Sequence, residues 1–303
     1  MRVVQVLFLL LGLAGTADAE EVLVRRPDAS WREIFRGPFG VSQLFAMPTA
    51  NVVGAYQLRL YGDASLLSER DVLSTSSVAA LGFGDLAQLE YRQSAAISHR
   101  SRELFGLPSL GVQFEVPLRE RRYVPRFGLA LRFGLPHEDV DRPNLSFDER
   151  ATDLYLVTSL VLSRVELHVG TRISAASIEP TSADGGQAVK ETLILPAVGL
   201  GWGISAHTSI LVEASMIPRF ELPTDADAGA IGADPYGRAG VRWFALPWLT
   251  LDASVGYHVE IERRDRAPNT SGSALVDWDI RLGGELAIPW GAVVCRSVGV
   301  FCS

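Results

Sequence analysis

Apolar and polar residues alternate along much of this chain, at the two-residue period of an extended strand. The clearest run spans residues 249–261, where apolar residues at every odd position oppose a polar set that includes Asp252, His258 and Glu260. A helix of the same sequence would have no continuous apolar face. Because the run is close to the roughly 9 to 11 residues of a tilted membrane-crossing strand, we predict lipid against one face and water against the other.

The same alternation recurs between connections that are short and long in turn. One short connection is the Gly84-Asp85 pair, which is typical of a tight hairpin turn. This connectivity predicts an all-β fold, an antiparallel up-and-down transmembrane β-barrel whose even strand number removes the free sheet edges. We expect about twelve strands, at residues 53–61, 72–83, 86–97, 110–118, 126–135, 152–162, 165–178, 190–204, 208–220, 236–245, 248–261 and 273–288.

The start of the chain differs from the rest. A charged beginning, a short apolar run and the small residues Ala17-Asp18-Ala19 predict a signal peptide over residues 1–19. Residues 20–52 lack alternation and are expected to form a periplasmic lead-in or a plug segment. Beyond the signal no apolar run reaches the length of a membrane helix, so a membrane would be crossed by the barrel, expected over residues 53–290.

Composition and charge narrow the function classes. Hydrophobic residues make up 48% of the chain and charged residues 21%, which excludes a disordered protein. The net charge of -7 predicts no nucleic-acid partner. Residues 291–303 form a C-terminal tail in which Cys295 and Cys302 are candidates for a disulfide, the alternative being two unpaired thiols.

The polar faces of the predicted strands carry carboxylates and arginines in nearly equal number. Unpaired charges in a dry interior cost several kcal/mol each, so these groups are expected to form ion pairs or to face water. A one-residue register error would move any of them to the lipid side. The side chains that we expect to line the interior are Arg59, Arg132, Glu166, His168, Arg172, Glu213, Arg242, Asp252, His258, Asp279 and Arg281.

Several functions fit such a barrel. Twelve strands lie between side-chain-filled eight-stranded barrels and open porins, which favours a narrow channel for passive diffusion of small hydrophilic solutes. The alternatives are a closed structural barrel with a salt-bridged interior, an outer-membrane enzyme using His168 or His258, and a secreted soluble β-sandwich. Because the chain lacks a G-x-S-x-G motif and the second histidine of a zinc motif, we predict no catalytic residues, no metal and no cofactor.

Aromatic residues supply an independent signal, since transmembrane barrels carry an aromatic girdle at each membrane interface. They gather at both predicted strand ends, with Phe83, Phe127, Trp202, Trp243, Trp248 and Trp290 toward the short turns and Phe133, Phe220, Tyr257 and Trp278 toward the long loops.

With these features, residues 53–288 resemble Gram-negative outer-membrane β-barrel proteins and are similar in layout to small porin-like barrels. The resemblance implies Sec-type export to the outer membrane, contact with its lipid and lipopolysaccharide, and insertion by the barrel-assembly machinery. One departure is that such barrels often end on an aromatic residue, whereas this chain ends Phe301-Cys302-Ser303.

Overall fold

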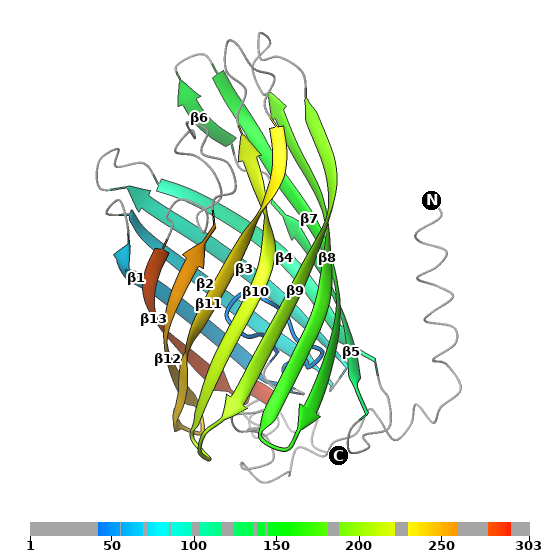
Figure 1. Ribbon diagram of the computed structural model, residues 1–303, viewed down its shortest axis with the longest axis vertical. Coiled ribbons are helices and arrows are strands. Elements are labelled where there is room, and N and C mark those ends of the chain that lie inside the picture. Colours follow the sequence, from blue (N-terminus) through cyan, green and yellow to red (C-terminus); the bar gives the residue numbers. More distant parts are fainter. Residues whose placement is uncertain are drawn as a thin grey trace.

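One antiparallel sheet curls round and closes on itself to form the body of the protein (Figure 1). The computed structural model describes residues 42–54, 56–68, 72–84, 86–98, 104–116, 124–135, 138–142, 145–180, 188–221, 230–259 and 278–291. Its strands are β1 (Leu58–Ser68), β2 (Val72–Phe83), β3 (Ala87–Ser98), β4 (Leu104–Glu115), β5 (Arg126–Gly134), β6 (Glu138–Arg142), β7 (Leu145–Leu162), β8 (Val165–Pro180), β9 (Val189–Gly203), β10 (Thr208–Glu221), β11 (Ala230–Leu246), β12 (Leu249–His258) and β13 (Trp278–Ile288).

Closure of the sheet depends on two pairings between strands that are not consecutive in the sequence. β1 pairs with β13 from Leu58–Ile288 to Ser68–Asp279, and β5 pairs with β7. In the described part of the chain β6 pairs with β7 alone, as a hairpin beyond the barrel wall. The other twelve strands therefore form a closed, up-and-down antiparallel barrel, which confirms the predicted fold class.

The two faces of the wall differ as the alternation predicts. Along β12, buried and exposed residues alternate from Thr250 to His258, with the polar residues buried and the apolar ones exposed. A water-soluble protein would bury its large apolar residues, so this inverted arrangement indicates a lipid-facing exterior. Each of the twelve barrel strands exposes at least one large apolar side chain: Leu60, Leu73, Leu89, Leu110, Phe127, Leu156, Val169, Ile194, Val212, Val241, Val255 and Leu282.

Aromatic side chains lie at both edges of this apolar band. Exposed members of the predicted belts are Phe83, Phe127, Trp202, Trp243 and Trp248 toward the short turns and Phe133, Tyr257 and Trp278 toward the long loops. Trp290 differs, because it is partly buried and packs edge-on against Tyr56, with ring centroids 5.6 Å apart. Within the described residues, no helix has the length and apolar composition needed to cross a bilayer.

Apart from the start of β1, the predicted strand ends hold well near the short turns, and they hold poorly at two of the long loops. β2 matches its predicted bounds, and Gly84 adopts the positive φ of 61° that its tight turn requires. By contrast, β7 begins at Leu145 and β11 at Ala230, inside segments predicted to be loops. These strands rise beyond the apolar band, where outward residues need not be apolar and the alternation therefore weakens.

The segment before β1 lies inside the barrel, in the half nearer the short turns (Figure 1). We call residues 42–54 the lumenal segment. The prediction that a strand begins at Val53 is wrong, because this residue is fully buried inside the barrel and β1 begins at Leu58. A turn at Tyr56, which has a φ of 56°, connects the segment to β1.

Parts of the predicted organisation lie outside the described residues. These parts are the signal peptide, residues 20–41 of the lead-in, and the tail from residue 292 that contains Cys295 and Cys302. The disulfide therefore stays a prediction. Of the predicted lead-in, residues 42–52 are described, and they lie within the barrel.

The lipid-facing exterior can be tested at Val169, which is 60% exposed on β8. Arginine there should lower the free energy of unfolding by about 2–4 kcal/mol, the cost of a cation near the middle of a bilayer. Guanidinium titration in lipid vesicles, followed by tryptophan fluorescence, measures this change. Ala206→Arg, in the exposed turn between β9 and β10, is the matched control and should cost less than about 1 kcal/mol. Equal costs at the two positions would contradict a lipid-facing β8.

Candidate functional site

The lumenal segment folds back on itself before it reaches the wall of the barrel. The amide of Leu44 donates to the carbonyl of Met47 at 3.0 Å, and the amide of Thr49 donates to the carbonyl of Ser42 at 3.0 Å. These bonds close a tight loop with residues 44–47 at its tip. The tip has no strand beside it, so its remaining backbone groups need partners from the wall.

Glu213 on β10 binds the backbone amides of this tip. The amides of Phe45, Ala46 and Met47 all donate to its carboxylate, with nitrogen–oxygen distances of 3.1 to 3.2 Å. Successive amides that point to one side form a concave anion site, and hydrogen bonds to a charged acceptor are stronger than those between neutral groups. The charge of Glu213, only 2% exposed, is thus stabilised by backbone amides, and among the described residues it forms no ion pair.

Arginines of the wall bind the carbonyl groups of the same loop. Arg242 on β11 donates to the carbonyls of Leu44 at 2.8 Å and of Gln43 at 3.3 Å. Arg132 on β5 donates to the carbonyl of Ala46 at 3.3 Å. The loop tip is therefore held through its amides on one side and through its carbonyls on two others.

The second half of the lumenal segment is bound by an amide side chain. Nε2 of Gln113 lies 3.3, 2.9 and 2.6 Å from the carbonyl oxygens of Ser42, Thr49 and Asn51. The side chain of Asn51 accepts a hydrogen bond from Arg126 at 2.6 Å. Gln113 thus joins the two arms of the loop to β4.

A buried serine–histidine pair holds the middle of the segment. Oγ of Ser159 lies 2.7 Å from Nδ1 of His168 and accepts the amide of Ala50 at 2.9 Å. Glu166 stands 3.9 Å from the other ring nitrogen of His168 and accepts a hydrogen bond from the side-chain Nδ2 of Asn51 at 3.2 Å. The three side chains have the residue types of a hydrolytic triad, but the serine is fully buried and its oxygen already binds the segment. Their geometry serves attachment.

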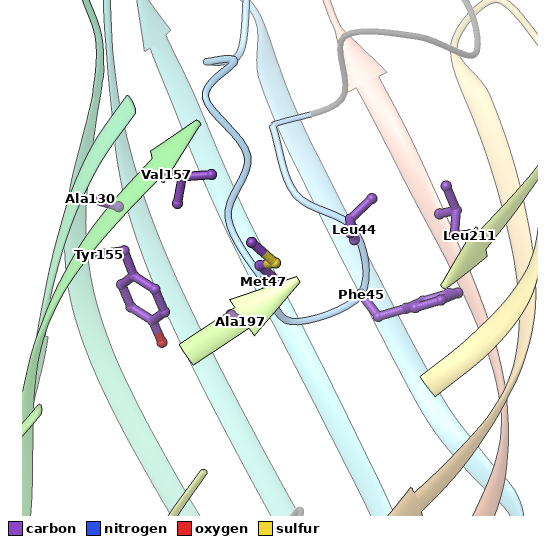
Figure 2. Packing of buried hydrophobic residues seen from close by; sticks show 8 residues of the cluster. All are labelled: Leu44, Phe45, Met47, Ala130, Tyr155, Val157, Ala197 and Leu211. Carbon is purple, nitrogen blue, oxygen red and sulfur yellow. The ribbon is translucent and has the colours of Figure 1, made fainter. Parts of the chain in front are cut away.

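Apolar contacts complete the seat of the loop. Leu44, Phe45 and Met47 pack with wall side chains in a buried cluster, which Figure 2 shows from close by. The guanidinium of Arg242 lies over the ring of Phe45, 5.9 Å from its centroid. The wall members of the cluster are Ala130, Tyr155, Val157, Ala197 and Leu211.

Glycines in the wall give the segment its space. A Cβ atom at Gly128 would lie 2.7 Å from Cα of Ala50, and one at Gly199 would lie 2.2 Å from a methyl carbon of Leu44. A Cβ atom at Gly82 would lie within 2.5 Å of the carbonyl oxygens of Val53 and Gly54, at the end of the segment. All three positions face inward, so the wall is shaped to fit the segment.

Among the described residues, the ion pairs of the interior run along the wall and do not cross the lumen. Arg172 on β8 binds Asp153 on the neighbouring β7, with the closer of its two bonds at 2.7 Å. Other pairs span one intervening strand at a glycine, where a side chain would collide with them. Two such pairs are Glu90–Arg132, which crosses β4 above Gly111, and Arg238–Asp279, which crosses β12 above Gly256.

All eleven side chains that the sequence analysis selected lie in the barrel interior, and they fall into two groups. Those that hold the lumenal segment, directly or through Ser159, are Arg132, Glu166, His168, Glu213 and Arg242. Those that form ion pairs within the wall are Arg59 with Glu285, Arg172 with Asp153, Asp252 with Arg242, and Asp279 and Arg281 with each other, while His258 lies 3.3 Å from the carboxylate of Asp234. Their pore-lining role stays a prediction.

Sequence reasoning missed the uncharged residues of the site. Gln113, Ser159 and Gly128 all bind or accommodate the segment, and Gln88 accepts the amide of Val53 at 2.8 Å. Their signal was present in the alternation, because each occupies an inward position on its strand. We selected interior residues by their charge, so these uncharged residues were not among the predictions.

In the part of the chain that the structure describes, two cavities adjoin the segment. The larger, about 150 Å³ in volume, lies on the long-loop side of the loop tip, and we call it the vestibule cavity. The smaller, about 10 Å³, lies between the segment and the wall near Arg59 and Glu285. A cavity of that size holds about one water molecule, so the segment fits closely against this part of the wall.

Comparison with protein families and with curated proteins finds no match. Among solved structures, the barrel is similar to an outer membrane channel of Pseudomonas putida F1, with 12% identity, a TM-score of 0.50 and coverage of 80% of this chain and 97% of that one. It is also similar to the NanC porin, with 10% identity, a TM-score of 0.49 and coverage of 76% and 98%. At 12% identity the likeness establishes the fold alone. In fold, the chain is a closed β-barrel similar to that outer membrane channel, and its exposed apolar band is that of a membrane-spanning barrel.

Proposed function

We propose that this protein is a passive channel for small hydrophilic solutes in the outer membrane of a Gram-negative bacterium, closed by its own lumenal segment. The observation that carries the proposal is the fit between segment and wall. The lumen is filled by a loop that is covalently attached through β1 and held by side-chain hydrogen bonds, while inward glycines make room for it. The proposal is that this loop can leave its seat while the barrel stays folded.

The direction of the ion pairs favours a channel over a closed structural barrel. Pairs such as Arg172–Asp153 lie flat between neighbouring strands, and the Arg238–Asp279 pair spans a single strand. Without the segment, the lumen would therefore be lined by paired charges rather than bridged by them. A polar lining of both signs suits small hydrophilic solutes, with lumen width setting the size limit.

The proposal assigns the protein no catalytic role. Ser159 has its hydroxyl against His168, but its oxygen accepts the amide of Ala50 and the side chain is fully buried. In this view the partners are outer-membrane lipid and lipopolysaccharide around the band, the barrel-assembly machinery during insertion, and the solutes that pass.

Glu213 provides the first test. Replacing it with glutamine removes the charge that binds three amides of the loop, and should weaken the closed state by about 2–3 kcal/mol. The open fraction in planar bilayers should then rise at least about tenfold, because about 1.4 kcal/mol corresponds to a factor of ten. Single-channel recording in KCl, with the reversal potential under a salt gradient, measures opening and ion preference.

Glu285→Gln is the matched control for this test, since Glu285 also faces inward but is bound to Arg59 at 3.0 Å. Its open fraction should stay near that of the unmodified protein. If Glu213→Gln folds and inserts but opens no more often than Glu285→Gln, the segment does not close a channel.

Gly128 tests the fit from the side of the wall. Valine at this position would collide with the backbone of Ala50. It should therefore displace the lumenal segment although the sequence of that segment is unchanged. We expect long-lived open steps in the same bilayer recording. Gly201→Ala is the control, because a Cβ there meets only ordinary contacts at 3.6 Å and beyond. Equal behaviour of the two variants would count against a removable segment.

A further inference from the structure

The vestibule cavity lies directly on the loop tip of the lumenal segment. Residues 45–47 form one side of it, and wall residues farther from the short turns form the rest. Four arginines line it, namely Arg92, Arg172, Arg238 and Arg281. A solute entering from the long-loop side would meet this cavity before it met the segment.

Three of these arginines are neutralised by carboxylates of the wall. Arg172 binds Asp153 at 2.7 Å, as described above. Arg281 binds Asp63 at 3.1 Å, and Arg238 binds Asp279 at 2.5 Å. These pairs leave no net charge on that part of the lining.

Arg92 is different. Among the described residues it forms no ion pair, and its guanidinium donates instead to the neutral side-chain oxygen of Gln43 at 2.6 Å. Glu90, two residues away on β3, is already bound to Arg132 at 2.5 Å. Nε of Arg92 is buried without a hydrogen-bond partner in the described structure. The cavity therefore carries one positive charge that lacks a carboxylate.

The size and the surface of the cavity restrict what it can hold. A cavity of about 150 Å³ is known to accommodate benzene, which has six heavy atoms. Beside the arginines, Ser94 and Ser215 offer hydroxyl groups, while Met47 and Ile217 offer apolar surface. A small organic ion with a short apolar part matches this mixture.

We propose that the vestibule cavity binds a small organic monoanion, a carboxylate with a short apolar chain, through Arg92. A carboxylate is a stronger acceptor for a guanidinium than the amide oxygen of Gln43 is, because both partners are charged. Binding therefore displaces Gln43, which belongs to the lumenal segment. Where the proposed channel function holds, the arriving solute removes one of the contacts that keep the segment in place.

Binding is tested first, in detergent and without any measurement of conduction. Isothermal titration of the refolded protein with butyrate, against its neutral isostere butyramide, should give an affinity for butyrate at least about tenfold higher. Arg92→Gln should reduce butyrate affinity at least about tenfold. Arg59→Gln, an inward arginine on the other side of the segment, should leave it unchanged. Equal binding of the two ligands, or equal effects of the two variants, would overturn the site.

Gln43→Ala separates a ligand contact from a structural role of Arg92. Both Gln43→Ala and Arg92→Gln break the same bond to the segment, but only the first frees the guanidinium for a ligand. The site therefore predicts tighter butyrate binding in Gln43→Ala and weaker binding in Arg92→Gln. If both variants bind butyrate more weakly, Arg92 acts by holding the segment and the proposal fails.

Bilayer recording then tests the coupling to opening. Butyrate should raise the open fraction of the unmodified protein more than butyramide does, and this difference should vanish in Arg92→Gln. A protein that binds butyrate but never conducts would overturn the channel and leave the anion site standing. A protein that conducts equally with butyrate and butyramide would overturn the coupling.

Discussion

The bond between the Glu213 carboxylate and three consecutive backbone amides is the interaction on which the closed interior depends. A loop without a strand beside it must find other partners for its amides and carbonyls, since buried backbone groups are rarely left unpaired. In this barrel the wall supplies them, with one carboxylate for the amides and arginines such as Arg242 for the carbonyls. The three amides compensate the charge of the Glu213 carboxylate, which explains why an acid can be buried there. Removing Glu213 would in turn leave those amides without an acceptor.

Inward glycines solve two packing problems in the same wall. At Gly128 and Gly199 they admit the backbone and a side chain of the lumenal segment. At Gly111 and Gly256 they let an ion pair reach across one strand to the next but one. In both cases the missing Cβ lets the neighbouring group lie close to the wall. The ion pairs therefore stay against the wall, and the lumenal segment occupies the space inside them.

Lipid explains which parts of this structure can be predicted from sequence. Within the bilayer outward residues are mostly apolar and uncharged, so β8 and β12 have clear alternation and their inward residues follow from the period of two. Above the bilayer that demand ends, and the early part of β7 has the composition of a loop although it pairs as a strand. The inward position of Glu213 is therefore predictable. Its partners are not, because they are backbone amides 166 to 168 residues away, and a search for opposite charges does not consider them.

The arrangement also gives the two faces of the segment different roles. Its connection to β1 lies at the short-turn rim, where Gln57 accepts the amide of Gly82 at 2.9 Å. Its loop tip points the other way and forms part of the vestibule cavity, beside Arg92. In the proposed channel, a solute from the long-loop side therefore meets the loop tip and Arg92 together in the vestibule cavity. Arg242 donates to the carbonyls of both Gln43 and Leu44, so displacement of the Gln43 side chain would act on a stretch of backbone that Arg242 also holds. In the proposed opening, a solute that replaces the Arg92–Gln43 bond would leave the bonds made by Glu213 as the remaining hold on the loop tip.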